Sequence, residues 1–142
     1  MKISRFIKRY RNELIIVLTI VLLFGFMPKY LENFESNMSS FDDDIASGKK
    51  LVWFYAPWCG HCKTMHKAWD SASKVVNSNK NNMIKLNIGD SENKQHQAIA
   101  SKYKVQGFPT ILLLHNGETS AEYNGGRTKT AFVKYCKENG IS

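Results

Sequence analysis

Two cysteines separated by two residues, Cys59 and Cys62, constrain this chain more than any other feature. Residues 51–55, which precede them, are apolar, aromatic or β-branched and predict a buried strand. Residues 63–69, which follow them, predict a helix. The pair would then lie where a strand leads into a helix N-terminus, whose unpaired N–H groups and dipole stabilise a thiolate. Because the thiolate is the species that attacks disulfides, this arrangement predicts thiol–disulfide exchange.

The two thiols are expected to have different roles. Cys59 stands at the helix start and should be the more exposed, attacking thiol, whereas Cys62 lies one turn further in and should be the resolving thiol. Exchange would pass through a mixed disulfide on Cys59, which Cys62 releases by closing the Cys59–Cys62 redox disulfide. His61 can place positive charge near the Cys59 sulfur and so lower the pKa of that thiol.

A structural disulfide and half of a zinc site are the alternative interpretations of the pair. Zinc takes four ligands, usually with a second Cys or His pair. The remaining cysteine of the chain is Cys136, for which we expect the role of a small buried hydrophobe, with a disulfide between two chains as the alternative. We therefore favour redox chemistry and expect no metal and no other cofactor.

Three segments carry a resemblance to a known family. Residues 54–63 (FYAPWCGHCK) resemble the active-site segment of the protein disulfide isomerase family, within the thioredoxin superfamily. Residues 107–110 (GFPT) resemble its cis-proline loop, and residues 123–127 (YNGGR) resemble its turn before the last helix. The resemblance covers about residues 41–140. It implies an α/β, thioredoxin-like fold over residues 41–142, in which a central mixed sheet is flanked by helices.

The resemblance also implies roles for residues around the cysteines. Gly60 and His61 between them are typical of an oxidant or isomerase rather than of a reductase. Pro109 would be cis and would face the two sulfurs, so that the backbone of Phe108 can pair with an extended substrate chain. Trp58 would contribute to the same substrate site. An ordinary turn proline is the alternative for Pro109.

Two further positions affect the expected rate of catalysis. By resemblance, Arg127 can swing toward the site and stabilise the thiolate of Cys62, with a solvated surface arginine as the alternative. The family usually carries a buried acid, two residues before Tyr55, that relays the proton of the resolving cysteine, and Trp53 takes that place here. A low-turnover binding module that captures partners by mixed disulfide therefore stays open beside the enzyme. His66 shares the helical face of Cys62, and we expect a partly exposed polar position there.

The N-terminus carries an apolar segment. Residues 14–27 are almost continuously apolar and, continued to residue 31, span about 27 Å as a helix, close to the roughly 30 Å of a hydrocarbon core. We therefore expect an N-terminal transmembrane helix over residues 14–31, an uncleaved signal anchor followed by a linker at residues 32–40. A cleaved signal peptide is the alternative, but residues 28–40 lack the paired small residues that cleavage needs.

Charge predicts how this segment is oriented. Residues 1–13 form a basic flank with five cationic side chains, Lys2, Arg5, Lys8, Arg9 and Arg11. The positive-inside rule keeps this flank in the cytosol and puts the domain on the lumenal (endoplasmic reticulum-like), periplasmic or virion-exterior side. These compartments are usually the oxidising ones, which agrees with a disulfide-handling site.

The same charge count argues against nucleic acid as a partner. The net charge is +8, of which residues 1–13 supply +4 because Glu13 offsets one of the five basic groups. The remainder is spread without a basic cluster. We expect instead a protein disulfide isomerase-like thiol–disulfide oxidoreductase that forms, reduces or isomerises disulfides in exported proteins. Its partners would be cysteine-containing protein substrates, a redox partner or glutathione, and membrane lipid through residues 14–31.

The remaining pattern predicts alternating strands and helices, then a hairpin and a last helix. Asn116-Gly117 is the turn signal of the hairpin. The expected helices cover residues 41–48, Cys59 to about residue 76, 93–103 and 128–139, and the expected strands cover residues 50–56, 83–88, 110–115 and 119–124.

Overall fold

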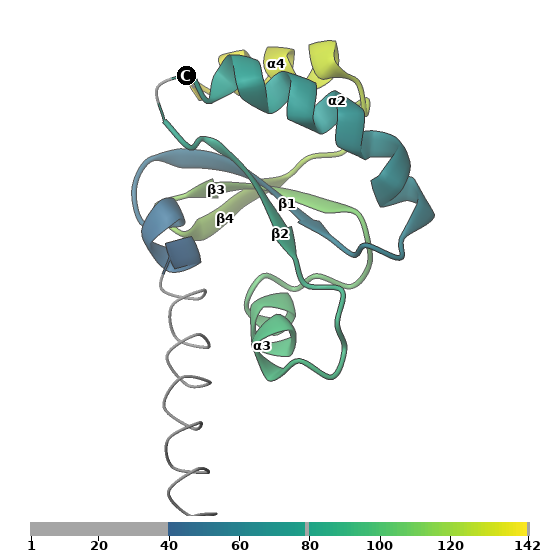
Figure 1. The fold of residues 1–142 in the computed structure, drawn as a ribbon. Helices are drawn as coiled ribbons and strands as arrows, with labels where there is room; N and C mark the ends of the chain where they lie inside the picture. The colour runs from purple at the N-terminus through teal and green to yellow at the C-terminus, as the bar shows by residue number, and fades with distance from the viewer. Residues whose placement is uncertain (1–39, 79, 142) are drawn as a thin grey trace, which may run out of the picture. The chain divides into compact units, whose positions relative to one another are not determined.

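The computed structural model describes residues 40–78 and 80–141 (Figure 1). A helical segment at residues 40–45 precedes the labelled elements. These are β1 (Lys49–Tyr55), α2 (Gly60–Val76), β2 (Met83–Asn87), α3 (Lys94–Lys102), β3 (Thr110–His115), β4 (Glu118–Glu122) and α4 (Lys129–Glu138). This is the order that the sequence predicts, and most ends fall within two residues of the expected ones.

The predicted transmembrane helix at residues 14–31 lies outside the described residues, as do the basic flank and nearly all of the linker. Within residues 40–78 and 80–141, no helix has the length and apolar character that crossing a membrane requires.

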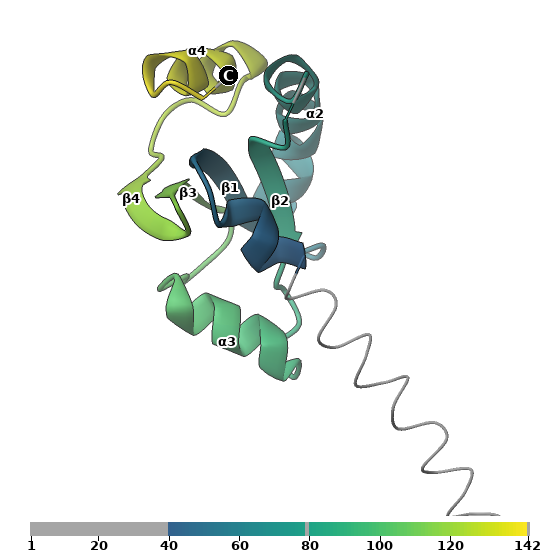
Figure 2. The same ribbon diagram turned by 90° about the vertical axis from the view of Figure 1, so that its left-hand side faces the viewer.

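The four strands form one mixed sheet in the order β2-β1-β3-β4. β1 runs parallel to β2 and antiparallel to β3, and β4 closes the hairpin with β3. Helices α2 and α4 cover one face of the sheet, and α3 covers the other (Figures 1 and 2). The predicted central mixed sheet flanked by helices is thus confirmed.

The central strand β1 supplies both layers of the core. Successive side chains of a strand point to opposite faces. Accordingly, Leu51 and Trp53 join the core under α2 and α4, whereas Val52 and Phe54 join the core under α3 and the segment at residues 40–45. Because both faces are buried, the strand is apolar at every position from Leu51 to Phe54 and shows no alternation.

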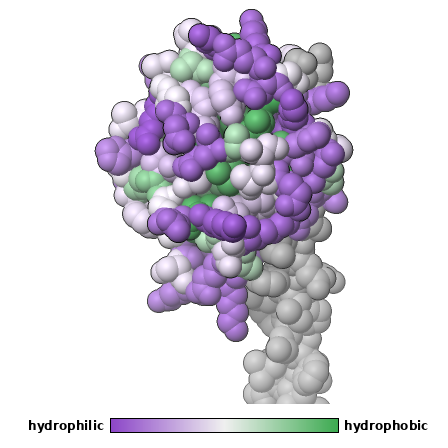
Figure 3. Space-filling model, turned by 180° about the vertical axis from the view of Figure 1, so that it is seen from behind, coloured by the Kyte–Doolittle hydropathy of each residue, from purple (hydrophilic) through white to green (hydrophobic). Residues whose placement is uncertain are grey.

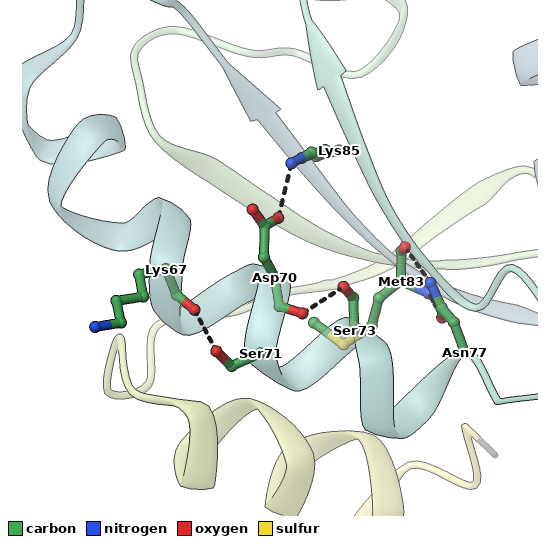
Figure 4. Close-up of polar contacts among 7 residues, drawn as sticks. All are labelled: Lys67, Asp70, Ser71, Ser73, Asn77, Met83 and Lys85. Atoms are coloured by element: carbon green, nitrogen blue, oxygen red, sulfur yellow. Dashed lines mark hydrogen bonds and ion pairs between the residues drawn. The ribbon is translucent and has the colours of Figure 1, made fainter.

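The C-terminal end of α2 is tied to the start of β2 by Asn77 (Figure 4). Its Oδ1 accepts hydrogen bonds from the N–H groups of Asn82 at 2.9 Å and Met83 at 2.7 Å, and its Nδ2 donates to the Met83 carbonyl at 2.9 Å. Earlier in the same helix, the Asp70 carboxylate pairs with the Lys85 ammonium of β2, with 2.7 Å between Oδ1 and Nζ. These contacts fix α2 beside the sheet, so the helix begins at a defined place above the carboxyl end of β1.

The hairpin between β3 and β4 turns as predicted. Asn116 and Gly117 both have positive φ, 52° and 81°, as a two-residue hairpin turn of the primed type requires. The Asn116 Oδ1 also accepts the Gly48 N–H at 2.8 Å, which ties the turn to the chain entering β1. β4 forms the exposed edge of the sheet beyond it.

Candidate active site

Cys59 occupies the N-cap position of α2. Its backbone is extended, with φ −74° and ψ 118°, and its Sγ accepts the backbone N–H of Cys62 at 3.4 Å. The same sulfur lies 3.5 Å from the carbonyl oxygen of Phe108, to which the thiol can donate. A sulfur at the N-cap takes the place of the hydroxyl or carboxylate oxygen that usually accepts these N–H groups, and it gains from negative charge there.

The electrostatics of Cys59 favour its thiolate. Burial alone would raise the pKa of this thiol. The hydrogen bond from the Cys62 thiol, those from the N–H groups of Cys62 and His61, and the charge of Arg127 outweigh burial and leave the pKa below 9.0. The charge of Arg127 acts to lower the pKa of both thiols, although the side chain is exposed; its movement toward Cys62 stays a prediction.

Cys62 has the opposite environment. It is fully buried, and burial, helped by the hydrogen bond that it gives to Cys59, raises the pKa of its thiol to about 11. Cys59 retains 7% of its surface, so the expected difference in exposure is confirmed. The pKa is lowered for Cys59 and raised for Cys62, which is the difference that an attacking and a resolving cysteine need.

The loop before β3 faces Cys59. The Phe108–Pro109 peptide bond is cis, as the resemblance implies. Trp58 is 67% exposed beside it, with its Nε1 donating to the Gly89 carbonyl at 2.8 Å. The Trp58 and Phe108 rings meet edge to face with 5.7 Å between centroids. The attacking sulfur is therefore flanked by an exposed indole and by the cis-proline loop.

A groove of about 1020 Å³ begins at this loop. It runs from His61, Phe108, Pro109 and Arg127 toward the edge strand β4. On the face that Figure 3 shows, small hydrophobic areas are surrounded by hydrophilic side chains.

Trp53 fills the position of the acid that the family usually carries. It is completely buried, and its Nε1 finds no hydrogen-bond partner among residues 40–78 and 80–141. The Trp53 ring packs against the His66 ring of α2, with 4.8 Å between ring centroids, and against the Tyr55 ring, with 5.0 Å between centroids. Among the same residues no carboxylate is buried, so no acid replaces the missing one within the core.

Sequence reasoning missed the contact between Trp53 and His66. The four-residue spacing from Cys62 was visible, and the expected partly exposed position of His66 is confirmed. Which strand residue this helical face would meet was not visible, because it depends on how α2 lies across β1.

The third cysteine has no part in the site. Cys136 is fully buried in α4, and burial raises the pKa of its thiol to about 11. Its expected role as a small buried hydrophobe is confirmed. Within the part of the chain that the structure describes, no group of His, Cys, Asp and Glu residues is placed to hold a metal ion.

Comparison with known proteins identifies the class. The thioredoxin family model matches residues 32–138, so the chain belongs to the thioredoxin family. Human protein disulfide-isomerase A6 is 38% identical over 96 residues, which cover 66% of this chain and 21% of that protein. The chain therefore spans about a fifth of the length of this relative.

Solved structures agree with this assignment. The first thioredoxin domain of mouse protein disulfide-isomerase A4 is 31% identical, with a TM-score of 0.58 over 70% of this chain and 69% of that one. The zinc-bound form of human ERp44 is 30% identical, with a TM-score of 0.57 over 68% of this chain and 28% of that one. The resemblance to the protein disulfide isomerase branch of the superfamily, expected from three short segments, is confirmed.

Proposed function

We propose that this protein is a thiol–disulfide oxidoreductase of the protein disulfide isomerase type, using Cys59 and Cys62. The observation that carries the proposal is the N-cap position of Cys59, where its sulfur accepts the Cys62 N–H and faces the Phe108 carbonyl. Cys59 would attack a substrate disulfide as a thiolate, and Cys62 would then release the mixed disulfide. Gly60 and His61 tune the first thiol, and Trp58, Phe108 and Pro109 receive the substrate chain.

The substrates would be cysteine-containing exported proteins, and glutathione or another thiol carrier would reset the pair. We propose that residues 14–31 anchor the chain in a membrane, with the N-terminus in the cytosol. The domain would then lie on the lumenal, periplasmic or virion-exterior side. The apolar length of that segment and its five basic flanking residues support this part of the proposal. Alkaline extraction and protease protection of membranes carrying the full chain test it, because an anchored, translocated domain stays in the pellet and resists external protease.

The reduction potential of the Cys59–Cys62 pair is the measurement that tests the enzymatic proposal. In glutathione buffers, a value near −180 mV would support oxidation or isomerisation of exported proteins, and a value near about −270 mV would indicate a reductase. A pair that stays oxidised at every redox potential of the glutathione buffer would be a structural disulfide, and this result would refute the proposal.

A low-turnover binding module is the second candidate, and Trp53 favours it. With no buried carboxylate in the described part of the chain, release by Cys62 would be slow and the mixed disulfide would persist. Repeated turnover of a small disulfide substrate under a reducing buffer separates the two: an enzyme completes many cycles, whereas a capture module stops after one.

A further inference from the structure

The buried thiol of Cys62 has to lose a proton before it can resolve a mixed disulfide, and this step, which rests on the proposed function, lacks an obvious acceptor. Burial is the largest cause that raises the pKa of the Cys62 thiol, and it persists when Cys59 carries the substrate, so the protonated thiol predominates at neutral pH. Since the thiolate is the attacking species, resolution depends on a group that takes this proton.

Several neighbours cannot take it. The sulfur of Cys59 is already bonded to the substrate at this stage, and the guanidinium of Arg127 has no acceptor atom. His61 directly precedes Cys62, and adjacent helical residues do not share a face; its side chain lines the groove beside Phe108 and Pro109. Among residues 40–78 and 80–141, the buried side chains include no carboxylate.

His66 lies in the right place. It follows Cys62 by four residues on α2, so the two Cβ atoms are about 5 to 6 Å apart on one helical face. Its half-buried imidazole meets two rings of β1 edge to face. The ring centroids are 4.8 Å apart for Trp53 and 5.2 Å apart for Tyr55. Imidazole is also the side chain that ordinarily exchanges protons between pH 5 and 8.

The indole of Trp53 supplies a second, independent observation. Its Nε1 is buried without a partner in the described part of the chain, although Trp53 contacts His66 and shares a core cluster with Cys62. A buried N–H of this kind is commonly satisfied by an internal water molecule. A single water molecule beside Trp53 would bridge the thiol and the imidazole.

The charges around His66 leave its proton-accepting role intact. Lys63 precedes it by three residues on the same helix, and Tyr55 faces it from β1. One turn further along, Asp70 is paired with Lys85 of β2, which neutralises its carboxylate (Figure 4). That pair is partly exposed and is two turns away from Cys62, so it does not compete for the proton.

We propose that His66 accepts the proton of Cys62 during resolution of the mixed disulfide. The proton passes from Cys62 Sγ to the imidazole, and the resulting thiolate attacks Cys59 Sγ. The Cys59–Cys62 bond forms while the bond from Cys59 to the substrate sulfur breaks. The substrate leaves as a thiolate, which takes up the proton that the imidazolium returns, so the protein dithiol is oxidised and the substrate disulfide is reduced.

The test separates the two steps of exchange in the full chain, kept in detergent solution. The reduced protein is mixed rapidly with glutathione disulfide and quenched with acid, and the glutathionylated form and the closed disulfide are counted by mass spectrometry. Variants H66A and H66Q are compared with the unchanged chain and with H115A, a matched histidine substitution on the exposed end of β3. A parallel H61A series measures the nearest competing imidazole.

The expected result is selective. In H66A and H66Q, glutathionylation of Cys59 keeps its rate, while resolution at pH 7 slows by about tenfold or more and the mixed disulfide accumulates. The logarithm of the resolution rate then rises in proportion to pH, and added imidazole restores the rate in H66A. H115A leaves both steps unchanged.

Three outcomes would overturn the inference. Resolution could keep its rate and pH profile in both His66 variants, or fall equally with the first step, as a packing defect around Trp53 would cause. Loss of the pH profile in H61A instead would assign the proton to His61. If the unchanged chain never reacts with glutathione disulfide, the proposed function fails as well, which is a different and recognisable result.

Discussion

The two faces of the sheet are built from the same strand yet differ in what they tolerate. The face under α3 is closed by rings with no functional demand on them: Phe54 stacks on Tyr103 at 5.3 Å, and Phe41 meets both edge-on. The face under α2 and α4 contains two thiols of opposite electrostatic character and a buried indole N–H that has no partner among residues 40–78 and 80–141. The reactive thiols therefore lie on the face where burying polar groups costs free energy. The opposite face contributes apolar packing, which stabilises the fold.

The largest expected effect on this comparison is C59S. Exchange with glutathione disulfide should stop, because a serine hydroxyl does not form the mixed disulfide, while the melting temperature stays close to that of the unchanged chain. Mass spectrometry and a thermal melt measure the two properties. C136A is the matched control, since that cysteine is buried away from the site, and it should keep exchange. Residual exchange in C59S would mean that Cys62 can attack alone.

F54A should give the reverse result on the opposite face. Removing this fully buried ring leaves a cavity between Phe41 and Tyr103, which should cost about 3 to 5 kcal/mol in the free energy of unfolding. Chemical denaturation measures this loss. The rate of Cys59 alkylation in the molecules that remain folded should be unchanged. A change in that rate would show that the two faces are coupled.

W53F tests whether the buried indole N–H is a defect in the dry core. In a dry core, the gap left by the smaller ring and the relief of an unsatisfied donor would nearly cancel. Because we infer that a water molecule satisfies this N–H, removing the donor relieves no penalty, and the free energy of unfolding should fall by about 1 to 3 kcal/mol. No change in chemical denaturation would mean that the core is dry and that no water bridges Cys62 and His66.

The ionisation of the two thiols should be separable by pH. Thiolate absorbance should rise with a midpoint below 9.0 for Cys59, and C59S should abolish this step. The absorbance of Cys62 and Cys136 should appear only near pH 11. Because the pKa of both buried thiols is raised in the folded state, the stabilisation that their neutral forms contribute is complete below the unfolded pKa and is lost as pH rises from about 9 through 11. A single midpoint for all three thiols would contradict this.

The smallest effect is expected for R127A. Its exposed charge is the weakest of the influences that lower the pKa of Cys59, so alkylation at pH 7 should slow by only about twofold, and less at high salt. R127K, which keeps the charge, is the control. A loss above tenfold would mean that the guanidinium contacts the site directly.

Sequence alone predicted the order of the elements because strong local signals mark them. Asn93 and Thr128 cap α3 and α4 at the expected starts, and Asn116-Gly117 sets the hairpin turn. The pair Cys59 and Cys62 was likewise predicted at the junction of β1 and α2. These features depend on neighbours within a few residues.

The parts that could not be predicted depend on contacts between distant segments. The hydrogen bond from Trp58 to Gly89 joins residues 31 positions apart, and the contact of Trp53 with His66 depends on how α2 crosses the sheet. The groove depends on β4 lying near the cis-proline loop. No local pattern contains this geometry, even though each residue type was visible.

The double burial of β1 has a consequence for how the molecule opens. Its backbone is hydrogen-bonded on both sides, to β2 and β3, and its side chains belong to both core layers. Neither layer can melt while the other stays closed, so both behave as one cooperative unit. Amide protons of β1 should therefore exchange with solvent only by global unfolding, whereas those of the exposed edge strand β4 exchange by local fraying.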